Sequence, residues 1–511
     1  MEYDRGPKLL LLNIALGLGT FIQILDTSIA NVAVPYIAGN LSVSADQGTW
    51  VITSFAASNA IVLPLTGWLS DYFGRIKLFV WSVLLFALMS FFCGFSTNLT
   101  MLVGFRVAQG AVAGSLIPLS QSLLLNFNPP DKQNLALGFW SMIVIVAPIL
   151  GPIIGGYLTE VYSWPWIFYI NVPIGIFSAT VVWIILKDRE SKIVRDPIDW
   201  VGLFLLAVGI SCLQIMLDKG KDLDWFESNI IITLTIVSAI SLAYFVVWSY
   251  FQQYPIVDFS FFKIRNFAVG TLATTIGYLF FFGSTVTVPL WLQTEQNYTA
   301  YWAGVAVAPI GIAPLFLSTI IGKNLYRFDL RVLAALSFFL FSLGFFYQSN
   351  FTTDVSLAVI MLARFFQGFG VAFFFLPLVQ LSMGGIPGEK LPSAAGLFHF
   401  MRILVGSGFG TSLTIEFWTR LEIFHHARLS EAWTIYRPLT NQFYDMLKDT
   451  SPRFTTDVIH HIGDMLIEQQ AFMLATNDLS WLAAYGFVLL IPLVFLCNRA
   501  KGGNGSTEVA H

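Results

Sequence analysis

The stretch RVAQG at residues 106–110 lies inside an apolar run and returns 258 positions later as RFFQG at residues 364–368. A proline follows each copy at a similar distance, Pro118 after the first and Pro377 after the second. A second match has nearly the same offset, because the glycine-led stretch 67–77 has a degraded counterpart at 322–331. Two matches at one offset predict a chain made of two related halves that run in the same direction.

The composition excludes most classes of soluble protein. Of the 511 residues, 56% are hydrophobic and only 11% are charged, whereas an ordinary soluble domain is about a quarter charged. The net charge of −3, without a basic block, argues against a nucleic-acid partner. All three cysteines lie in apolar stretches, which argues against a disulfide framework.

The apolar residues form fourteen candidate membrane spans, each near the 20 residues that a helix needs to cross a bilayer. The first begins at Leu9 and is longer than the apolar region of a cleaved signal peptide. The segments are 9–36, 48–69, 78–95, 100–125, 134–157, 166–186, 199–217, 229–250, 267–292, 300–322, 332–348, 355–381, 394–417 and 479–498.

Lys and Arg residues set the predicted orientation. With the N-terminus inside, the inward loops and chain ends carry 17 of them, whereas the short outward loops carry only Lys219 and Lys221. The positive-inside rule therefore places both termini in the cytoplasm. Segment 418–478 then lies outside, and its length exempts it from that rule.

The predicted fold class is an all-α membrane protein with two six-helix halves and two inserted helices. The first half covers residues 1–186, and the inserted helices with their loops cover 187–266. The second half covers 267–498 and includes the outer segment 418–478, and a cytoplasmic tail covers 499–511.

Asp26 is the only acidic residue well inside the first span. A charged Asp at a helix centre costs about 2.5–3.5 kcal/mol on insertion scales. An intramembrane carboxylate that gains and loses a proton can couple proton flow to another movement. The alternative is a static hydrogen bond to neighbouring helices.

Arg106 cannot be neutralised, so it needs a carboxylate or carbonyl partner. Asp26 is one candidate, and Gln109 lies one helical turn away. The alternative is a static clamp onto backbone carbonyls. Arg364 and Gln367 repeat the pattern in the second half, but no intramembrane acid there matches Asp26.

The spacing Gly67-x-x-x-Asp71-x-x-Gly74-Arg75-x-Lys77 joins the second and third spans. The glycines permit a tight turn, and we expect Asp71 to cap the next helix and to attract Arg75 or the neighbouring bundle. A charge pair on this cytoplasmic face would lock one conformation and release it in the other. Ordinary loop charge is the alternative.

The fifth span ends in Gly151-Pro152-Ile153-Ile154-Gly155-Gly156, after Pro148. Small residues four apart let two helices approach closely, and proline adds a kink. The pattern predicts a hinge or seal between the halves, or close packing alone.

His399 and Arg402 fall early in the thirteenth span. His399 is a candidate for a proton path or for a plain polar contact. His425-His426 and His460-His461 are too far apart, without a nearby Cys, to predict a metal site. The sequence contains no Walker loop, Gly-x-Ser-x-Gly or His-Glu-x-x-His motif, so we predict neither an enzyme nor a cofactor.

Two further features leave alternatives open. The aromatic groups Phe280–Phe282 and Phe373–Phe375 predict either a greasy cavity or plain packing. In the outer segment, apolar residues recur at helical spacing and predict an amphipathic helix that lies on the bundle or membrane, receives a partner, or packs on itself. The apolar residues are Val458, Ile459, Ile462, Met465 and Leu466, and the polar residue Gln469 continues the same spacing.

Taken together, these residues resemble the fourteen-helix drug:proton antiporter branch of the major facilitator superfamily. Residues 67–77 resemble its loop motif, 106–110 its fourth-helix motif, 151–156 its antiporter motif, and 25–35 the first-helix motif of this branch. Stretches such as WIFYINVPIG (166–175) and LQIMLDKGKDLDWF (213–226) are similar to EmrB-type multidrug exporter subunits.

The resemblance implies a proton-coupled antiporter in the inner membrane that exports hydrophobic or weakly acidic compounds. It also implies a periplasmic adaptor, of the EmrA-type membrane fusion proteins, and an outer-membrane channel as partners. It assigns proton coupling to Asp26 and Arg106, gating to Asp71 and Arg75, and the antiporter helix to Gly151 and Pro152.

The sequence departs from the family pattern at three positions. Tyr326 replaces the acid in the second copy of the loop motif, Pro165 stands where a small or basic residue is usual, and His399 stands where Asn is usual. Two other functions stay open beside multidrug export. One is a narrow-substrate exporter for a fatty acid or metabolite, and the other is a membrane sensor or scaffold that transports nothing.

Overall fold

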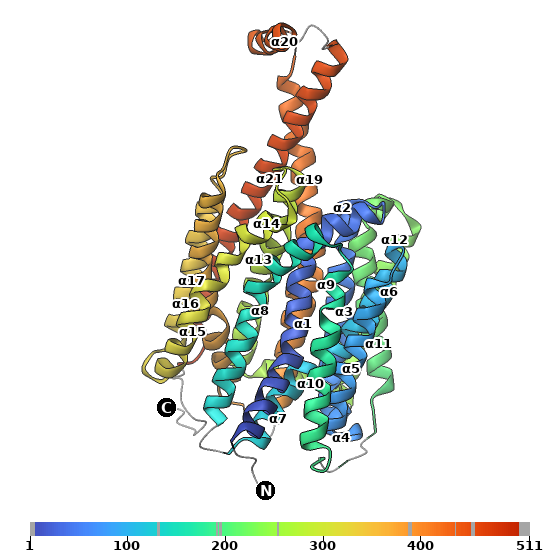
Figure 1. Ribbon diagram of the computed structural model, residues 1–511, viewed down its shortest axis with the longest axis vertical. Helices are drawn as coiled ribbons and strands as arrows, with labels where there is room; N and C mark the ends of the chain where they lie inside the picture. The colour runs from blue at the N-terminus through green and yellow to red at the C-terminus, as the bar shows by residue number, and fades with distance from the viewer. Residues whose placement is uncertain are drawn as a thin grey trace.

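The computed structural model describes residues 6–129, 133–190, 193, 197–252, 255–386, 391–434, 436–450 and 455–499. Within these ranges all regular secondary structure is helical, which confirms the predicted fold class. Figure 1 shows long helices standing side by side, with one group projecting beyond the others at the end of the bundle that we predict to face outward.

The first half comprises α1 to α10. Its helices break where the backbone requires it: Gly74 has a φ of 89° between α4 and α5, and the Asn98 side chain caps α6 by accepting from the Met101 amide at 2.8 Å. The elements are α1 (Pro7–Asn40), α2 (Ala45–Gly48), α3 (Trp50–Val62), η1 (Leu63–Leu65), α4 (Thr66–Phe73), α5 (Arg75–Gly94), α6 (Leu99–Ala113), α7 (Leu116–Phe127), α8 (Gln133–Val161), α9 (Trp166–Tyr169) and α10 (Asn171–Leu186).

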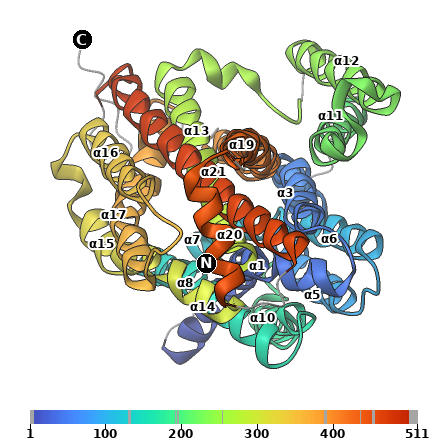
Figure 2. The ribbon, with the colours of Figure 1, turned by 90° about the horizontal axis from the view of Figure 1, so that it is seen from above.

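The inserted helices form an antiparallel pair beside α3, at the edge of the bundle (Figure 2). Asp199 caps the first of them and also accepts from the indole of Trp248 on the second at 2.9 Å. Only 22% of the apolar stretch of α12 is buried, so most of its surface would face lipid. The elements are α11 (Trp200–Lys219), η2 (Lys221–Leu223), η3 (Trp225–Glu227), α12 (Asn229–Phe251) and η4 (Phe259–Lys263).

The second half comprises α13 to α21. Its thirteenth predicted span is interrupted by η8, an eight-residue π-helix of the kind that is rare and concentrates at functional sites. The elements are α13 (Arg265–Thr294), α14 (Ala300–Val307), η5 (Ala308–Gly311), α15 (Ile312–Asn324), η6 (Leu325–Arg327), α16 (Leu330–Gln348), α17 (Leu357–Met383), α18 (Leu391–Met401), η8 (Arg402–Phe409), α19 (Gly410–Ala432), α20 (Pro438–Thr450) and α21 (Thr456–Phe495).

In the described part of the chain, twelve helical stretches are long and apolar enough to cross a membrane. The predicted fifth and thirteenth spans are not among them. Helix α8 nevertheless occupies the predicted fifth segment, and α18, η8 and α19 occupy the thirteenth, packed within the bundle. The total of fourteen spans therefore stays a prediction.

The outer segment 418–478 is not separate from the spans that flank it. Helix α19 continues to Ala432, and α21 runs unbroken from Thr456 into the last span, so the two form a projecting hairpin (Figure 1). Helix 458–469 is confirmed, but it neither lies on the bundle nor buries the whole predicted stripe. Ile459 is fully buried, whereas Met465 and Leu466 are 55% and 47% exposed.

Candidate functional site

The structure brings Asp26 of α1 and Arg106 of α6 together as an ion pair in the interior of the first half. Their exposed fractions are 2% and 0%. Arg106 also donates to the Gln109 side chain at 2.7 Å and, through Nε, to the carbonyl of Val51 at 2.8 Å. Both predicted partners of the guanidinium, a carboxylate and a backbone carbonyl, are therefore present at once.

Neutral donors complete the surroundings of the Asp26 carboxylate. Asn171 donates to its Oδ1 at 2.9 Å and Gln109 donates at 3.3 Å. Both amides also donate to the hydroxyl of Ser90, at 3.0 and 3.2 Å. Ser90 and Asn171 have no role in the sequence-based prediction. The available signal was a polar side chain within a largely apolar helix at each position.

Helix α1 links this pair to the boundary between the halves. Ser28 and Ile29 lie against Gly151 and Gly155 of α8, where any larger side chain would collide with them. Three residues further on, the carbonyl of Val32 accepts from Gln293 of α13 at 2.9 Å. A displacement of α1 at Asp26 would therefore be felt directly by both halves.

The antiporter stretch of α8 also packs against the second half. Gly156 lies against the carbonyl of Ala300, and the carbonyl of Pro152 lies against Gly304 of α14. These contacts join the two halves at one end of the bundle, which is the outer end in the predicted orientation. The side chain of Pro148 lies outside the described residues.

The loop stretch 67–77 differs from the prediction at its helix cap. Asp71 lies within α4 and is exposed, so it does not cap α5. The acceptor is Glu190, which follows α10 and takes hydrogen bonds from the amides of Ile76 and Lys77 at 3.0 and 2.9 Å. Gly67 has open space around its Cα, and Arg75 begins α5 directly after Gly74. The predicted cap by Asp71 was wrong because the real acceptor is far away in sequence.

In the second half, Arg364 and Gln367 are buried and bonded to each other at 2.8 Å. Arg364 also donates to the carbonyl and hydroxyl of Ser284 at 3.0 and 3.1 Å. In the described ranges no carboxylate lies within ion-pair distance of Arg364.

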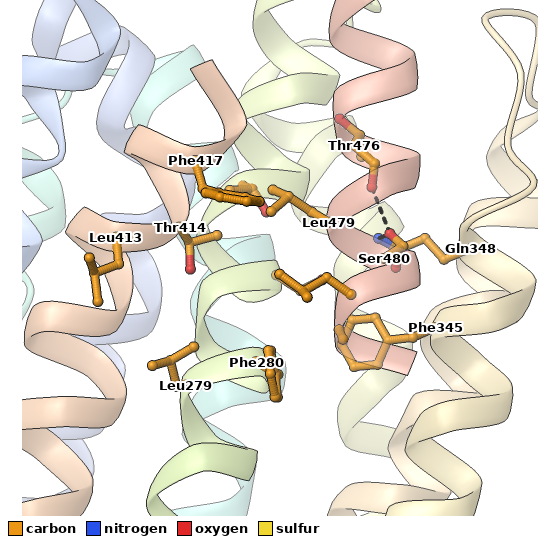
Figure 3. A pocket seen from close by; sticks show the side chains of 14 residues that line it. Leu279, Phe280, Phe345, Gln348, Leu413, Thr414, Phe417, Thr476, Leu479 and Ser480 are labelled. Atoms are coloured by element: carbon orange, nitrogen blue, oxygen red, sulfur yellow. Dashed lines mark hydrogen bonds between the residues drawn. The ribbon is translucent and has the colours of Figure 1, made fainter. Parts of the chain in front are cut away.

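His399 and Arg402 lie at the junction of α18 and η8 and do not join the Arg364 network. The Arg402 guanidinium stacks over the rings of Tyr278 and Phe375, 5.2 and 5.4 Å from their centroids. His399 Nδ1 is buried without a hydrogen-bond partner in the described structure. The aromatic groups divide between two roles: Phe374 is fully buried in the core, whereas Phe280 lines a cavity of about 220 Å³ (Figure 3).

Asp218, near the outer end of α11, is a carboxylate that sequence analysis did not select. It accepts from Thr53 of α3 at 2.8 Å, from Ser412 of α19 at 2.5 Å, and from Gln214 of its own helix at 2.9 Å. The inserted pair is thus tied to both halves through one side chain. The feature of the sequence that could have pointed to Asp218 is an acidic residue at the end of an otherwise apolar span.

Comparisons with known proteins identify the family. The model of the Major Facilitator Superfamily matches residues 16–411. Multidrug export protein EmrB of Haemophilus influenzae is 46% identical over 499 residues, which are 98% of this chain and 97% of that protein. Fatty acid resistance protein FarB of Neisseria gonorrhoeae is 45% identical over 511 residues, which are 99% of this chain and 100% of that protein.

Solved structures agree on the fold alone. A bacterial homolog of the human lysosomal transporter Spinster, in an inward-facing and unoccupied conformation, has a TM-score of 0.63 at 15% identity and covers 98% of this chain and 100% of its own. A POT peptide transporter in complex with sulfate has a TM-score of 0.65 at 13% identity and covers 97% of each chain. With its repeated helical halves and near full-length relatives, the chain belongs to the major facilitator superfamily.

Proposed function

We propose that the chain is a proton-coupled antiporter that exports hydrophobic and amphipathic compounds, including drugs and weak acids, across the bacterial inner membrane. The observation that carries the proposal is the buried pair of Asp26 and Arg106, surrounded by neutral amide donors. Relatives that are 46% identical are named multidrug export proteins, which supports the substrate class.

The pair offers a simple way to couple a proton to a movement. Ionised Asp26 holds Arg106 by charge, and protonation from outside removes that charge. The guanidinium then keeps Gln109, the Val51 carbonyl and the faces of the Phe55 and Phe168 rings, none of which carries a charge. The contact between α1 and α6 therefore weakens. Because α1 also contacts α8 and α13, the change would reach the boundary between the halves. Each proton that crosses the full potential supplies about 2.3 kcal/mol per 100 mV.

We also propose a topology and two protein partners for the chain. Residues 1–186 and 267–498 act as the two halves that rock against each other, with 187–266 as an inserted unit and both termini cytoplasmic. Asp71, Arg75 and Gly74 act at the cytoplasmic gate. A periplasmic adaptor and an outer-membrane channel would receive the substrate, and the projecting hairpin of α19 to α21 is the part of the chain that reaches furthest toward them.

Gradient-driven transport in proteoliposomes tests the proposal. An imposed pH gradient should drive substrate movement by the native chain, and Asp26→Asn should reduce it by about tenfold or more, because the neutral amide cannot titrate. Asp46→Asn is the matched control, since Asp46 pairs with Lys221 at 3.3 Å outside the membrane. Full gradient-driven export by Asp26→Asn would refute the coupling role, and no transport of any compound would favour a sensor or scaffold.

A narrower substrate range is the second candidate, favoured by the 45% identity to a fatty acid resistance protein. A deletion strain that becomes sensitive to long-chain fatty acids, but not to dyes or uncouplers, would select it.

A further inference from the structure

Each half contains a buried polar network, and four positions of the first network correspond to positions 258 residues later in the second. Asn171 has no such counterpart, because residue 429 is a leucine. Arg106 and Gln109 correspond to Arg364 and Gln367, and Ser90 corresponds to Gln348. The bonds correspond as well: Gln109 donates to Ser90 at 3.2 Å, and Gln367 donates to Gln348 at 3.0 Å. By the same offset, Asp26 corresponds to Ser284, which Arg364 contacts as Arg106 contacts Asp26.

The second network therefore contains a positive charge without its acid. Arg364 is 1% exposed, and a guanidinium remains charged in a protein. Its contacts in the described structure are to neutral oxygens of Ser284 and Gln367, and its Nε is buried without a partner. An uncompensated buried charge is unfavourable. A bound anion from outside the chain would therefore stabilise this network.

A cavity lies beside Ser284, the residue that corresponds to Asp26. It has a volume of about 220 Å³ between α13, α16, α19 and α21. Figure 3 shows Gln348, Thr476 and Ser480 on one side of it and Leu279, Leu413 and Phe417 on the other. Ser284 also lines it, so the cavity reaches the residue that takes the place of Asp26. Leu413 and Phe417 are 45% and 48% exposed, so the apolar side continues to the surface of the bundle.

Two donors on the polar side are free for a ligand. The Ser284 hydroxyl accepts from Arg364, but its own proton has no acceptor among the described residues. The Gln348 amide uses one hydrogen on Ser480 at 2.9 Å, which leaves its second hydrogen available. By contrast, the hydroxyl of Thr287, which also lines the cavity, is already bonded to the carbonyl of Gly283 at 3.0 Å.

We propose that this cavity binds a single-chain amphipathic carboxylic acid, with the ionised head at Ser284 and Gln348 and the chain along the apolar side. The ligand carboxylate would supply to Arg364 the negative charge that Asp26 supplies to Arg106. The inference rests on the proposed export function and assigns a substrate class to a site in the second half.

The depth of Ser284 along α13 argues against a phospholipid headgroup at the polar side of the cavity. A volume of about 220 Å³ accommodates the head and part of one acyl chain, with the rest reaching the bilayer through the open side. Ser284 lies ten residues before the end of α13 at Thr294, about 15 Å along the helix axis. A phospholipid headgroup at the membrane surface would not reach it.

Binding of decanoate to the purified full-length protein in phosphatidylcholine nanodiscs tests the proposal, with decanol as the uncharged ligand of equal chain length. Decanoate should bind about tenfold or more tightly than decanol, because only decanoate offers the charge. Ser284→Asp should place the acid in the protein, abolish that preference and raise the unfolding temperature. Thr285→Val is the matched control and should keep the preference, because the Thr285 hydroxyl is bonded to the carbonyl of Phe281 at 2.9 Å and does not line the cavity.

Three results would overturn the proposal: equal affinity for decanoate and decanol, native decanoate affinity in Ser284→Asp, or displacement of decanoate by phosphatidylglycerol at comparable concentration. The assay needs no gradient, so it separates this site from proton coupling. Asp26→Asn should bind decanoate like the native chain while its gradient-driven export is lost. If the native chain binds decanoate but exports nothing, the proposed function is refuted and the binding site stands. If it exports substrate but does not prefer decanoate to decanol, the binding site is refuted and the proposed function stands.

Discussion

The carboxylate of Glu190 lies against the bare Cα of Gly74, where a side chain on residue 74 would collide with it. From this place Glu190 binds the first amides of α5, at Ile76 and Lys77. The start of α5 is thus held by a residue that follows α10, and this contact connects the third span to the sixth.

Glu190→Ala should destabilise this end of α5, because two amides lose their acceptor. We expect a loss of about 1 kcal/mol in stability, typical of a missing helix cap, together with slower transport. Asp188→Ala, at an exposed position two residues earlier, is the control. Thermal unfolding in detergent measures the effect, and equal unfolding temperatures for the two variants would contradict it.

Gly304→Val should prevent the outer ends of the halves from closing. The new side chain would meet the carbonyl of Pro152 on α8, and backbone cannot move aside easily. Export should fall by about tenfold or more while the amount of protein in the membrane stays the same. Gly104→Val offers the comparison, because nothing lies within 4 Å of a side chain placed there; equal export by both variants would exclude closure at this contact.

Asp218→Ala should loosen the inserted pair from the two halves. Donors on three helices lose a bond to this carboxylate. Thr53 keeps the Trp50 carbonyl and Gln214 keeps the Ser412 hydroxyl, whereas the Ser412 hydroxyl loses its acceptor. A buried donor without a partner costs about 1–3 kcal/mol. Spin labels on α11 and α3 would report a broader distance distribution, measured by pulsed electron resonance. Glu227→Ala, at an exposed site in η3, should leave the distribution unchanged; a narrow distribution in Asp218→Ala would argue against the link.

The contact between the end of α13 and the outer segment should become less stable as the pH rises. Burial, with Glu468 and Glu422 nearby, raises the pKa of Glu295 from 4.5 to about 7. The folded state then holds a proton that the unfolded state has lost, so stability is fully present below the ordinary value and declines as the pH rises toward about 7. Glu295→Gln should flatten this dependence.

Unfolding temperatures at about pH 5 and about pH 8 would measure the difference. Glu422 shares the same surroundings, and burial also raises its pKa. Glu422→Gln should therefore flatten the dependence in the same direction. A native protein that is more stable at the higher pH would show that Glu295 is ionised throughout.

The sequence predicted the helical class and named Asp26 as one candidate partner of Arg106, because these depend on apolar length and on the cost of isolated charge. It could not predict that Glu190 caps α5, since the acceptor lies 114 positions from Ile76. Local periodicity gave no sign of the π-helix at Arg402–Phe409. Ser284 was visible at the position of Asp26, but a serine in an apolar helix gains meaning only when the cavity beside it is known.

Helix α21 joins the last span and the outer segment in one rod of 40 residues, about 60 Å long. Such a rod acts as a lever with its pivot in the bilayer. With roughly half of its length beyond the membrane, a tilt of about 10° would carry the tip by about 5 Å. A protein seated on that tip would therefore sense which way the pump faces, and force applied there would in turn favour one of the two orientations.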